Sequence, residues 1–370
     1  MEVQDGAPLL EVEHLRVLFR VRAGLLIDRT VGQVHAVDDV TFNLGAGETL
    51  GIVGESGCGK TTLIRSLARL VDATSGSIRF RGEDITKARQ RDLAPIRREV
   101  QMVFQDPQAS LNPRKRVIQI LSTPLRLRGT PRNQLENETR KLLERVGLHP
   151  EHINRFPHEF SGGQRQRIGV ARALAVKPQL ILLDEPVSAL DVSIQAQVIN
   201  LLDELQDDLG LSYVFVAHDL SVVRHVSDRI VVMYLGKLME VSPAEELYHK
   251  PIHPYTSALL GAIPIPDPEE NRARERPILT GEPPNPINPP TGCRFHTRCP
   301  RATDVCRALE PQLTEYANGH LAACHHPQNV SVAEIAGASR SSFTPLSAGE
   351  ERPEAEGASP FAVRPARPEK

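Results

Sequence analysis

Up to about residue 250, the apolar positions of this 370-residue chain alternate between two patterns. Short runs rich in β-branched residues predict strands that are buried on both faces, as in a parallel sheet. These runs are Thr49–Val53, Leu180–Leu183, Tyr213–Val216 and Ile230–Met233. Between them, apolar residues recur at helical spacing, as they do over 63–71 and 198–209. Strands that alternate with helices predict an α/β fold with a mostly parallel sheet.

The composition changes near residue 250. Of the 30 prolines, 11 lie in residues 1–250 and 19 in residues 251–370, and four of the five cysteines lie between residues 293 and 324. We therefore expect a regular domain over 1–250 and a separate extension over 251–330. From 331 to 370 the chain consists mostly of Ser, Ala, Glu, Pro and Arg. This segment has little to bury, which predicts a disordered tail.

Charge and hydropathy exclude several classes of protein. The chain has 44 basic and 46 acidic residues, which argues against binding to nucleic acids or anionic membranes through bulk charge. No apolar run approaches the roughly 18–20 residues that a membrane-spanning helix needs. The first ten residues, MEVQDGAPLL, lack the basic and apolar parts of a secretory signal. We therefore expect a soluble, intracellular protein.

Residues 51–62, GIVGESGCGKTT, contain the G-x-x-x-x-G-K-[ST] pattern of a phosphate-binding loop between a predicted strand and a predicted helix. Glycines let successive backbone N–H groups turn toward a polyphosphate, and the helix N-terminus adds its dipole. We expect Lys60 to reach the β- and γ-phosphates and the Thr61 hydroxyl to bind Mg²⁺. Cys58 is expected to be a small filler whose backbone matters more than its thiol. The predicted loop comprises Gly54, Glu55, Ser56, Gly57, Cys58, Gly59, Lys60, Thr61 and Thr62.

A second acidic site follows the apolar run in LILLDEP, residues 180–186. Asp184, at the end of the predicted strand, is expected to hold Mg²⁺ directly or through water. Glu185 is expected to point to the other side of an extended strand. There it can orient and deprotonate the water that attacks the γ-phosphate, as a general base.

Two further features lie nearby in the sequence. In FSGGQRQR, residues 160–167, Ser161 is a good N-cap, and Gly162 and Gly163 free the backbone to approach a phosphate. A second anion-binding helix start is redundant for one nucleotide on one chain. His218 follows the predicted strand Tyr213–Val216, at the carboxyl end where ligands bind in open α/β sheets.

This combination resembles the ATP-binding-cassette (ABC) ATPases. GESGCGKT resembles the Walker A loop, ILLDE the Walker B strand and SGGQ the family signature. Gln105 resembles the Q-loop glutamine, Ser188–Asp191 the D-loop and His218 the switch histidine; Phe160 departs from the commoner Leu before SGGQ. The resemblance implies a P-loop ATPase with a RecA-like parallel-sheet core, an antiparallel β edge and a helical subdomain inserted over about 105–170.

The resemblance also implies that two cassettes pair head to tail, with each ATP between the phosphate loop of one chain and the SGGQ of the other. Gln105 would sense the γ-phosphate and Mg²⁺, His218 would stabilise the γ-phosphate or the attacking water, and Phe19 would stack on the adenine. The implied catalytic residues are Lys60, Gln105, Glu185 and His218. The implied Mg²⁺ ligands are Thr61, Gln105 and Asp184. The implied nucleotide contacts outside the loop are Phe19, Ser161, Gly162, Gly163, Gln164 and Asp191.

Longer segments resemble the ATPases of oligopeptide and dipeptide importers. They include FQDPQASLNPR (104–114) and KPIHPYTSALLGAIP (250–264), where the C-terminal extension of that subfamily begins. The long interval between Phe19 and Ala36 resembles the F-type member of its two-ATPase pairs. The implied partners are a second, homologous ATPase subunit in a heterodimer, two transmembrane permease subunits and an extracytoplasmic substrate-binding protein, with no nucleic acid. The implied location is the cytoplasmic face of the inner membrane, where the chain is peripheral through the permeases.

The cargo stays open at this point. Peptides are the default of the subfamily, and nickel chelates or small sugars are alternatives. A cassette ATPase that acts on DNA or ribosomes is a further alternative, which the short 105–161 interval and the single set of motifs disfavour.

Cys293, Cys299, Cys306 and Cys324 follow a C-x₅-C-x₆-C-x₁₇-C spacing, which matches neither the C-x₂-C zinc pattern nor the ferredoxin runs. An intracellular location disfavours disulfides, and four thiolates suit zinc or an iron–sulfur cluster. Reduced thiols without a metal are the alternative. The resemblance favours a [4Fe–4S] cluster over Zn²⁺, with His296, His325 and His326 as alternative ligands.

Overall fold

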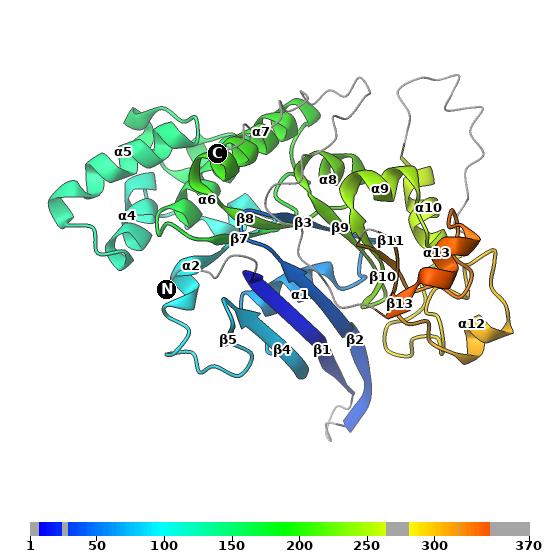
Figure 1. The fold of residues 1–370 in the computed structure, drawn as a ribbon. Coiled ribbons are helices and arrows are strands. Elements are labelled where there is room, and N and C mark those ends of the chain that lie inside the picture. The colour runs from blue at the N-terminus through cyan, green and yellow to red at the C-terminus, as the bar shows by residue number, and fades with distance from the viewer. Residues whose placement is uncertain (1–6, 24–28, 264–280, 318, 341–370) are drawn as a thin grey trace. The chain divides into compact units, whose positions relative to one another are not determined.

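The computed structural model describes residues 7–23, 29–263, 281–317 and 319–340, which divide into two compact units. The first unit takes the described parts of Met1–Gly45, Leu50–Lys87 and His218–Pro353. The second unit takes Ala46–Thr49 and Ala88–Ala217, which include most of the cyan and green helices of Figure 1. Each unit is therefore assembled from segments that lie far apart in the sequence.

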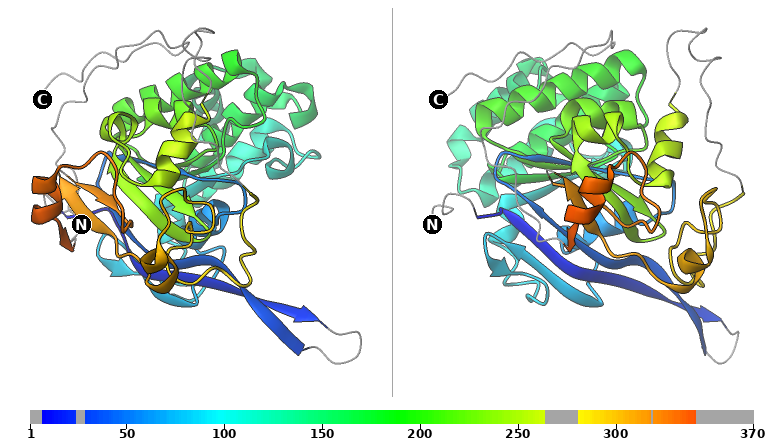
Figure 2. Two further views of the ribbon diagram at one scale, coloured as in Figure 1. Left: turned by 90° about the vertical axis from the view of Figure 1, so that its right-hand side faces the viewer. Right: turned by 45° about the vertical axis from the view of Figure 1, so that its right-hand side comes forward.

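The N-terminal part of the first unit is an antiparallel sheet with the strand order β2-β1-β4-β5. Its strands are β1 (Leu10–Ala23), β2 (Arg29–Leu44), β4 (Ser75–Phe80) and β5 (Glu83–Asp84). Beyond Arg16, which pairs with Ser75, β1 pairs with β2 alone, and this end of the hairpin stands clear of β4 (Figure 2). The predicted antiparallel edge is therefore present.

The first unit also contains a parallel pair of strands, β3 (Thr49–Val53) and β9 (Arg229–Tyr234). Every residue of both strands is buried, as the β-branched runs predict. On the other side of β9 the sheet continues with antiparallel strands, in the order β10 (Lys237–Pro243), β12 (His320–Ala322), β11 (Thr314–Ala317) and β13 (Ser339–Arg340). The helices of this unit are α1 (Lys60–Leu67), α8 (Leu220–Val226), α9 (Ala244–His249), α10 (Pro254–Gly261), α12 (Asp304–Ala308) and α13 (Val332–Gly337).

The second unit is built on three parallel strands in the order β6-β7-β8. These are β6 (Val100–Val103), β7 (Leu180–Asp184) and β8 (Ser212–Val216). The helices are α2 (Ile96–Glu99), α3 (Pro107–Ser110), α4 (Val117–Leu127), α5 (Leu135–Arg145), α6 (Gly162–Leu174) and α7 (Val192–Leu209). Helices α4, α5 and α6 pack against one another (Figure 1), in the interval where the helical subdomain is predicted. The predicted α/β class with parallel and antiparallel strands is confirmed.

The extension and the beginning of the tail add to the first unit. β12 pairs with β10 through Glu240 and Ala322, so that residues beyond 313 extend the sheet. Residues 331–340, which the composition assigns to a disordered tail, form α13 and β13. Ser331 caps α13 by accepting a hydrogen bond from the Glu334 N–H at 3.2 Å, while β13 pairs with β11. The rest of the predicted tail, 341–370, lies outside the described residues.

A buried carboxylate attaches the extension to this sheet. Glu240 of β10 is fully buried and accepts hydrogen bonds from the backbone N–H groups of Ile252 at 2.7 Å and His253 at 2.8 Å. His320 of β12 contacts the same carboxylate through Nε2 at 2.6 Å. Burial lowers the pKa of His253 to about 4, so its ring is neutral at physiological pH. Glu240 therefore joins three segments of the chain.

Replacing Glu240 with Ala removes the acceptor for two buried N–H groups and for His320. Because buried donors without a partner are costly, we expect Glu240→Ala to lower the free energy of unfolding by about 3 kcal/mol. Urea unfolding monitored by circular dichroism measures the effect. The exposed Glu83 of β5 provides a control, and Glu83→Ala should change stability by less than about 0.5 kcal/mol. Equal effects of the two variants would contradict this role of Glu240.

Candidate functional site

The predicted phosphate loop lies between β3 and α1 in the first unit. Gly54 and Gly59 have φ values of 153° and 112°, which side chains rarely tolerate. A Cβ atom on Gly54 would lie 2.2 Å from the carbonyl oxygen of Met233, and one on Gly59 would lie 1.9 Å from that of Ala36. The glycines are therefore required because the loop packs directly against the backbones of β9 and β2.

Lys60 curls back into this loop. Its side chain is buried, and Nζ donates hydrogen bonds to the carbonyl oxygens of Gly54 at 2.7 Å and Glu55 at 3.0 Å. The ammonium group thus stabilises the turn and places a positive charge inside it, as binding of a polyphosphate requires. Thr61, the predicted Mg²⁺ ligand, lies in the first turn of α1.

Cys58 contributes to the loop through its main chain. Its carbonyl oxygen accepts a hydrogen bond from the Gly236 N–H at 2.8 Å, in the turn between β9 and β10. The side chain is buried, and burial raises the pKa of the thiol, which keeps it protonated and unreactive. Both observations agree with the expectation that the backbone of Cys58 matters more than its thiol.

In the second unit, Gln105 and Glu185 are in contact. The Gln105 amide donates a hydrogen bond from Nε2 to Oε2 of Glu185 at 2.6 Å. Asp184 is the last residue of β7, and both acidic side chains are buried. The structure thus joins the predicted Q-loop glutamine to the predicted general base, a contact that the sequence did not indicate.

The backbone at Glu185 differs from the extended geometry expected from the sequence. Its φ is 47°, in the left-handed region that is uncommon for a residue with a side chain. The Glu185 N–H donates to the Val216 carbonyl oxygen at 3.0 Å, and the Ser188 hydroxyl donates to the Glu185 carbonyl oxygen at 3.1 Å. These contacts with β8 and the D-loop hold the turn. The premise of an extended strand at Glu185 is therefore wrong, because β7 ends at Asp184.

The SGGQ segment forms the start of α6. Ser161 and Gln164 make a reciprocal capping box, with the Gln164 N–H donating to Ser161 Oγ at 3.3 Å and the Ser161 N–H donating to Gln164 Oε1 at 3.0 Å. A Cβ atom on Gly163 would lie 2.4 Å from Cγ2 of Ile194, in the first turn of α7. Gly163 therefore permits close packing of the two helices, in addition to its predicted approach to a phosphate. Asp191, the N-cap of α7, and Ser161 are exposed.

Two other predicted site residues lie in the first unit. His218 is exposed and precedes α8, which begins after the N-cap Asp219. Phe19 lies in β1 and pairs with Val34 of β2. We expected Phe19 to end the first strand, but β1 continues to Ala23. With 43% of its surface exposed, Phe19 is not a core residue and presents a ring to solvent.

The four cysteines of the extension are free thiols in the first unit. Burial raises the pKa of Cys293 to about 11 and that of Cys324 to about 12, and each of these thiols is also within electrostatic range of the other three cysteines. However, among the described residues no three or more His, Cys, Asp or Glu side chains are arranged as metal ligands. The structure therefore gives no support to the predicted [4Fe–4S] cluster or Zn²⁺.

The histidines considered as alternative ligands contact other groups. His296 Nδ1 lies 2.8 Å from the Cys293 carbonyl oxygen, and His325 Nε2 lies 2.9 Å from that of Leu309. His326 Nε2 lies 2.7 Å from Thr303 Oγ1. These contacts brace the Cys-rich segment internally.

The sequence analysis missed two residues that contact the phosphate loop. Tyr255 of α10 accepts a hydrogen bond from the Glu55 N–H at 2.9 Å, and Arg298 forms an ion pair with the Glu55 carboxylate at 2.7 Å. Tyr255 lies in the segment KPIHPYTSALLGAIP, which by itself indicates no contact with the loop, and Arg298 lies in no motif. They follow Glu55 by 200 and 243 positions. For Arg298, the available signal was the pair of arginines in CRFHTRC, residues 293–299.

Two protein-family models match separate parts of this chain. Residues 37–188 match the model of the ABC transporter family, and residues 239–306 match that of the oligopeptide/dipeptide transporter C-terminal region. The oligopeptide transport ATP-binding protein AppF of Bacillus subtilis is 54% identical over 88% of this chain and 99% of its own length. OppF of Salmonella typhimurium is 50% identical over 87% of this chain and 97% of its own. The chain belongs to the oligopeptide transport ATP-binding proteins.

Solved structures agree with this family assignment. A dimeric post-hydrolysis structure of the ATP-binding cassette MJ0796, bound to ADP and Pi, matches with a TM-score of 0.56 and 26% identity. The match covers 64% of this chain and 98% of that one. The predicted ABC ATPase class and the F-type subfamily are thus confirmed. In the part of the chain that the structure describes, each helix is too short or too polar to cross a membrane.

The close approach of the loop to β9 makes a direct prediction for an ABC ATPase. Gly54→Ala places a methyl group against the Met233 carbonyl oxygen at a strained φ, and we expect at least tenfold weaker ATP binding (about 1.4 kcal/mol). Gly57→Ala is the matched comparison, because its Cβ meets no atom within 4 Å, although its φ of 77° adds strain. Titration with a fluorescent ATP analogue measures both. A larger loss for Gly57→Ala than for Gly54→Ala would refute the packing argument.

Proposed function

We propose that this chain is the ATP-hydrolysing subunit that energises an importer of oligopeptides or dipeptides. The observation that carries the proposal is identity of about half of all residues over nearly the whole length of proteins named oligopeptide transport ATP-binding proteins. The match to the C-terminal region of that transporter family supports the same substrate class.

ATP is the substrate of the proposed site. The loop from Gly54 to Thr62 binds its phosphates through backbone N–H groups and Lys60, which moves from its carbonyl partners to the β- and γ-phosphates. Thr61, Asp184 and Gln105 are the proposed ligands of Mg²⁺, which neutralises charge on the phosphates. The exposed ring of Phe19 stacks on the adenine.

Hydrolysis requires a base and an oriented water. In this proposal Glu185 takes the proton from the water that attacks the γ-phosphate, and His218 stabilises the γ-phosphate or the attacking water. The contact of 2.6 Å between Gln105 and Glu185 supports a shared role. An amide can hold the base through its nitrogen and present its oxygen to Mg²⁺. Gln105 would thereby link arrival of the ion to the position of the base.

The second half of each ATP site comes from a second, homologous ATPase subunit in this proposal. Ser161, Gly162, Gly163 and Gln164, with Asp191 of the D-loop, would face the nucleotide held by that subunit. The exposure of Ser161 and Asp191 supports this role, as does the capped, N–H-rich start of α6. The related cassette with bound ADP and Pi was solved as a dimer.

Coupling to import requires two permease subunits and an extracytoplasmic binding protein, which place the chain at the cytoplasmic face of the inner membrane. Growth of a deletion strain on peptides, nickel chelates or small sugars as the limiting nutrient distinguishes the possible cargoes. Loss of peptide use, restored by the wild-type gene, is expected. Co-purification with DNA or ribosomes rather than with hydrophobic subunits would contradict the transport function.

The role of Glu185 makes a kinetic prediction. Glu185→Gln removes the proton acceptor but keeps the size of the side chain, so ATP binding should persist while turnover falls at least about tenfold. Phosphate release by the complex, together with nucleotide binding, measures the two effects. The exposed Glu204 of α7 provides the control, and Glu204→Gln should hydrolyse ATP at the wild-type rate. Near-normal hydrolysis by Glu185→Gln would remove Glu185 from the role of base.

The [4Fe–4S] cluster stays a prediction that rests on the sequence resemblance, because the arrangement of the described cysteines does not support it. If the cluster is present, anaerobically purified protein should be brown and absorb near 400 nm, and Cys293→Ser should abolish the colour. Colourless protein with one zinc per chain would favour Zn²⁺. Colourless protein without metal would rule out both.

A further inference from the structure

A forked ion pair joins the phosphate loop to the Cys-rich segment of the extension, residues 293–324. Arg298 donates from Nη1 to Oε2 of Glu55 at 2.7 Å and from Nη2 to Oε1 at 3.1 Å. Only 6% of the Arg298 side chain is exposed, against 23% of Glu55. Two parallel, charge-assisted hydrogen bonds fix the orientation of both side chains, which a single contact would not do.

The main chain of Glu55 is held as well. The hydroxyl of Tyr255 accepts the Glu55 N–H at 2.9 Å, and Lys60 donates to the Glu55 carbonyl oxygen at 3.0 Å. Tyr255 is fully buried. The N–H, the carbonyl and the carboxylate of this residue therefore all have partners, and two of these partners, Tyr255 and Arg298, lie beyond residue 250.

Tyr255 and Arg298 belong to a cluster of packed aromatic rings and the cation above it. The rings of Tyr234, Tyr255 and Phe295 pack against one another with centroids 4.8 to 5.4 Å apart. The guanidinium of Arg298 also lies over the Tyr234 ring, 5.9 Å from its centroid. Aromatic pairs at these distances stabilise one arrangement of the side chains. Tyr255 and Arg298 are therefore held in place by contacts outside the loop, and they can in turn fix the position of the loop.

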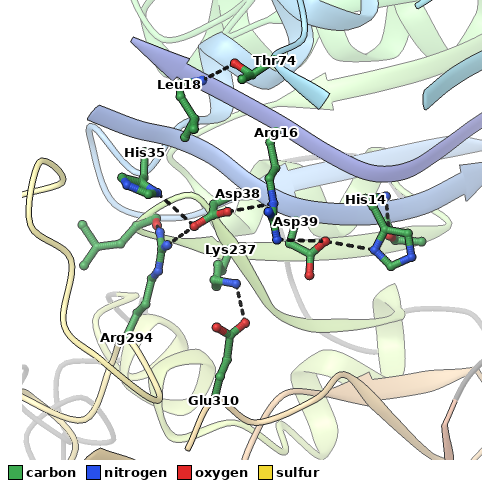
Figure 3. A network of polar contacts seen from close by, with 12 residues as sticks. His14, Arg16, Leu18, His35, Asp38, Asp39, Thr74, Lys237, Arg294 and Glu310 are labelled. Carbon is green, nitrogen blue, oxygen red and sulfur yellow. Dashed lines mark hydrogen bonds and ion pairs between the residues drawn. The ribbon is translucent and has the colours of Figure 1, made fainter. Parts of the chain in front are cut away.

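A second arginine of the same segment anchors the extension next to the loop. Arg294, also buried, donates to Asp38 of β2 and to the carbonyl oxygen of Leu235 in the β9–β10 turn. Asp38 also contacts Arg16 and His35 (Figure 3), and the guanidinium charge of Arg294 holds its pKa below the usual range. In the same β9–β10 turn, the Gly236 N–H donates to the Cys58 carbonyl oxygen of the loop. The segment 293–299 therefore contacts the loop directly through Arg298 and also contacts, through Arg294, the turn that binds the loop.

The charge of Glu55 has a consequence for the ligand. A carboxylate in a loop that receives a triphosphate repels it unless an opposite charge neutralises that carboxylate. We propose that Arg298 and Tyr255 are positioning residues for the nucleotide, which hold the phosphate loop through Glu55 and neutralise its carboxylate. The inference rests on the proposed ATP site. In this inference the extension contributes to nucleotide binding indirectly, because Tyr255 and Arg298 contact Glu55 and not the nucleotide.

The test compares nucleotide affinity in full-length variants. Arg298→Gln leaves Glu55 charged and unpaired, and we expect the Kd of a fluorescent ATP analogue to rise about tenfold at low salt. The rise should shrink at high salt, since the Glu55 carboxylate is partly exposed and salt screens part of its repulsion of the phosphates. The double variant Glu55→Gln/Arg298→Gln carries no such charge and should return to within about threefold of wild type. In the complex, KM should rise with little change in kcat.

Controls separate this role from a general loss of stability. Arg307→Gln breaks an exposed ion pair with Asp304 in the same segment and should leave the Kd unchanged. Tyr255→Phe keeps the ring but removes the acceptor for Glu55, and should weaken binding severalfold at any salt concentration. It therefore keeps the inference testable if Arg298→Gln fails to fold.

Each outcome bears on a different part of the inference. A wild-type chain that binds no nucleotide would overturn the ATP site itself, and the inference with it. Normal affinity in both folded Arg298→Gln and Tyr255→Phe would overturn the positioning role while leaving the ATP site intact. A double variant as weak as Arg298→Gln, with no dependence on salt, would overturn the neutralisation of Glu55.

Discussion

The phosphate loop depends on a close approach between backbones. Gly54 and Gly59 bring the loop so near the carbonyl oxygens of Met233 and Ala36 that a single methyl group would collide with them. The same approach lets Cys58 accept a hydrogen bond from the turn after β9. Because β9 is fully buried and pairs with β3, and β2 pairs with β1, the two strands form a fixed surface on which the loop adopts one conformation. Lys60 then occupies the inside of that curl.

In the second unit, the side chain of Glu185 is positioned by different means. β7 ends at Asp184, and the left-handed turn at Glu185 redirects the chain toward the D-loop. The cost of that backbone conformation is offset by hydrogen bonds to Val216 and from Ser188. The contact with Gln105 orients the resulting carboxylate. The left-handed backbone at Glu185, whose carboxylate is held by Gln105, is local strain of the kind found where the direction of a side chain matters more than local stability.

The extension has a structural role that its composition conceals. It is rich in proline and cysteine, yet it adds strands to β10 and is held there by the buried Glu240. Its arginines project back toward the phosphate loop and β2. The family match over residues 239–306 thus covers a segment that is integrated with the ATP-binding fold.

The sequence by itself determined the family, the motifs and the class of fold. Phosphate loops and strand-end acids are short, contiguous patterns whose chemistry depends on neighbouring residues, and buried parallel strands have a distinct composition. Tertiary structure alone decided the contacts between Gln105 and Glu185, between Tyr255 and Glu55, and between Arg298 and Glu55. These partners are 80, 200 and 243 positions apart, and no local pattern encodes which distant side chains will meet. These contacts depend on the pairing of strands and on the packing of the aromatic cluster, and both arise only when the chain has folded.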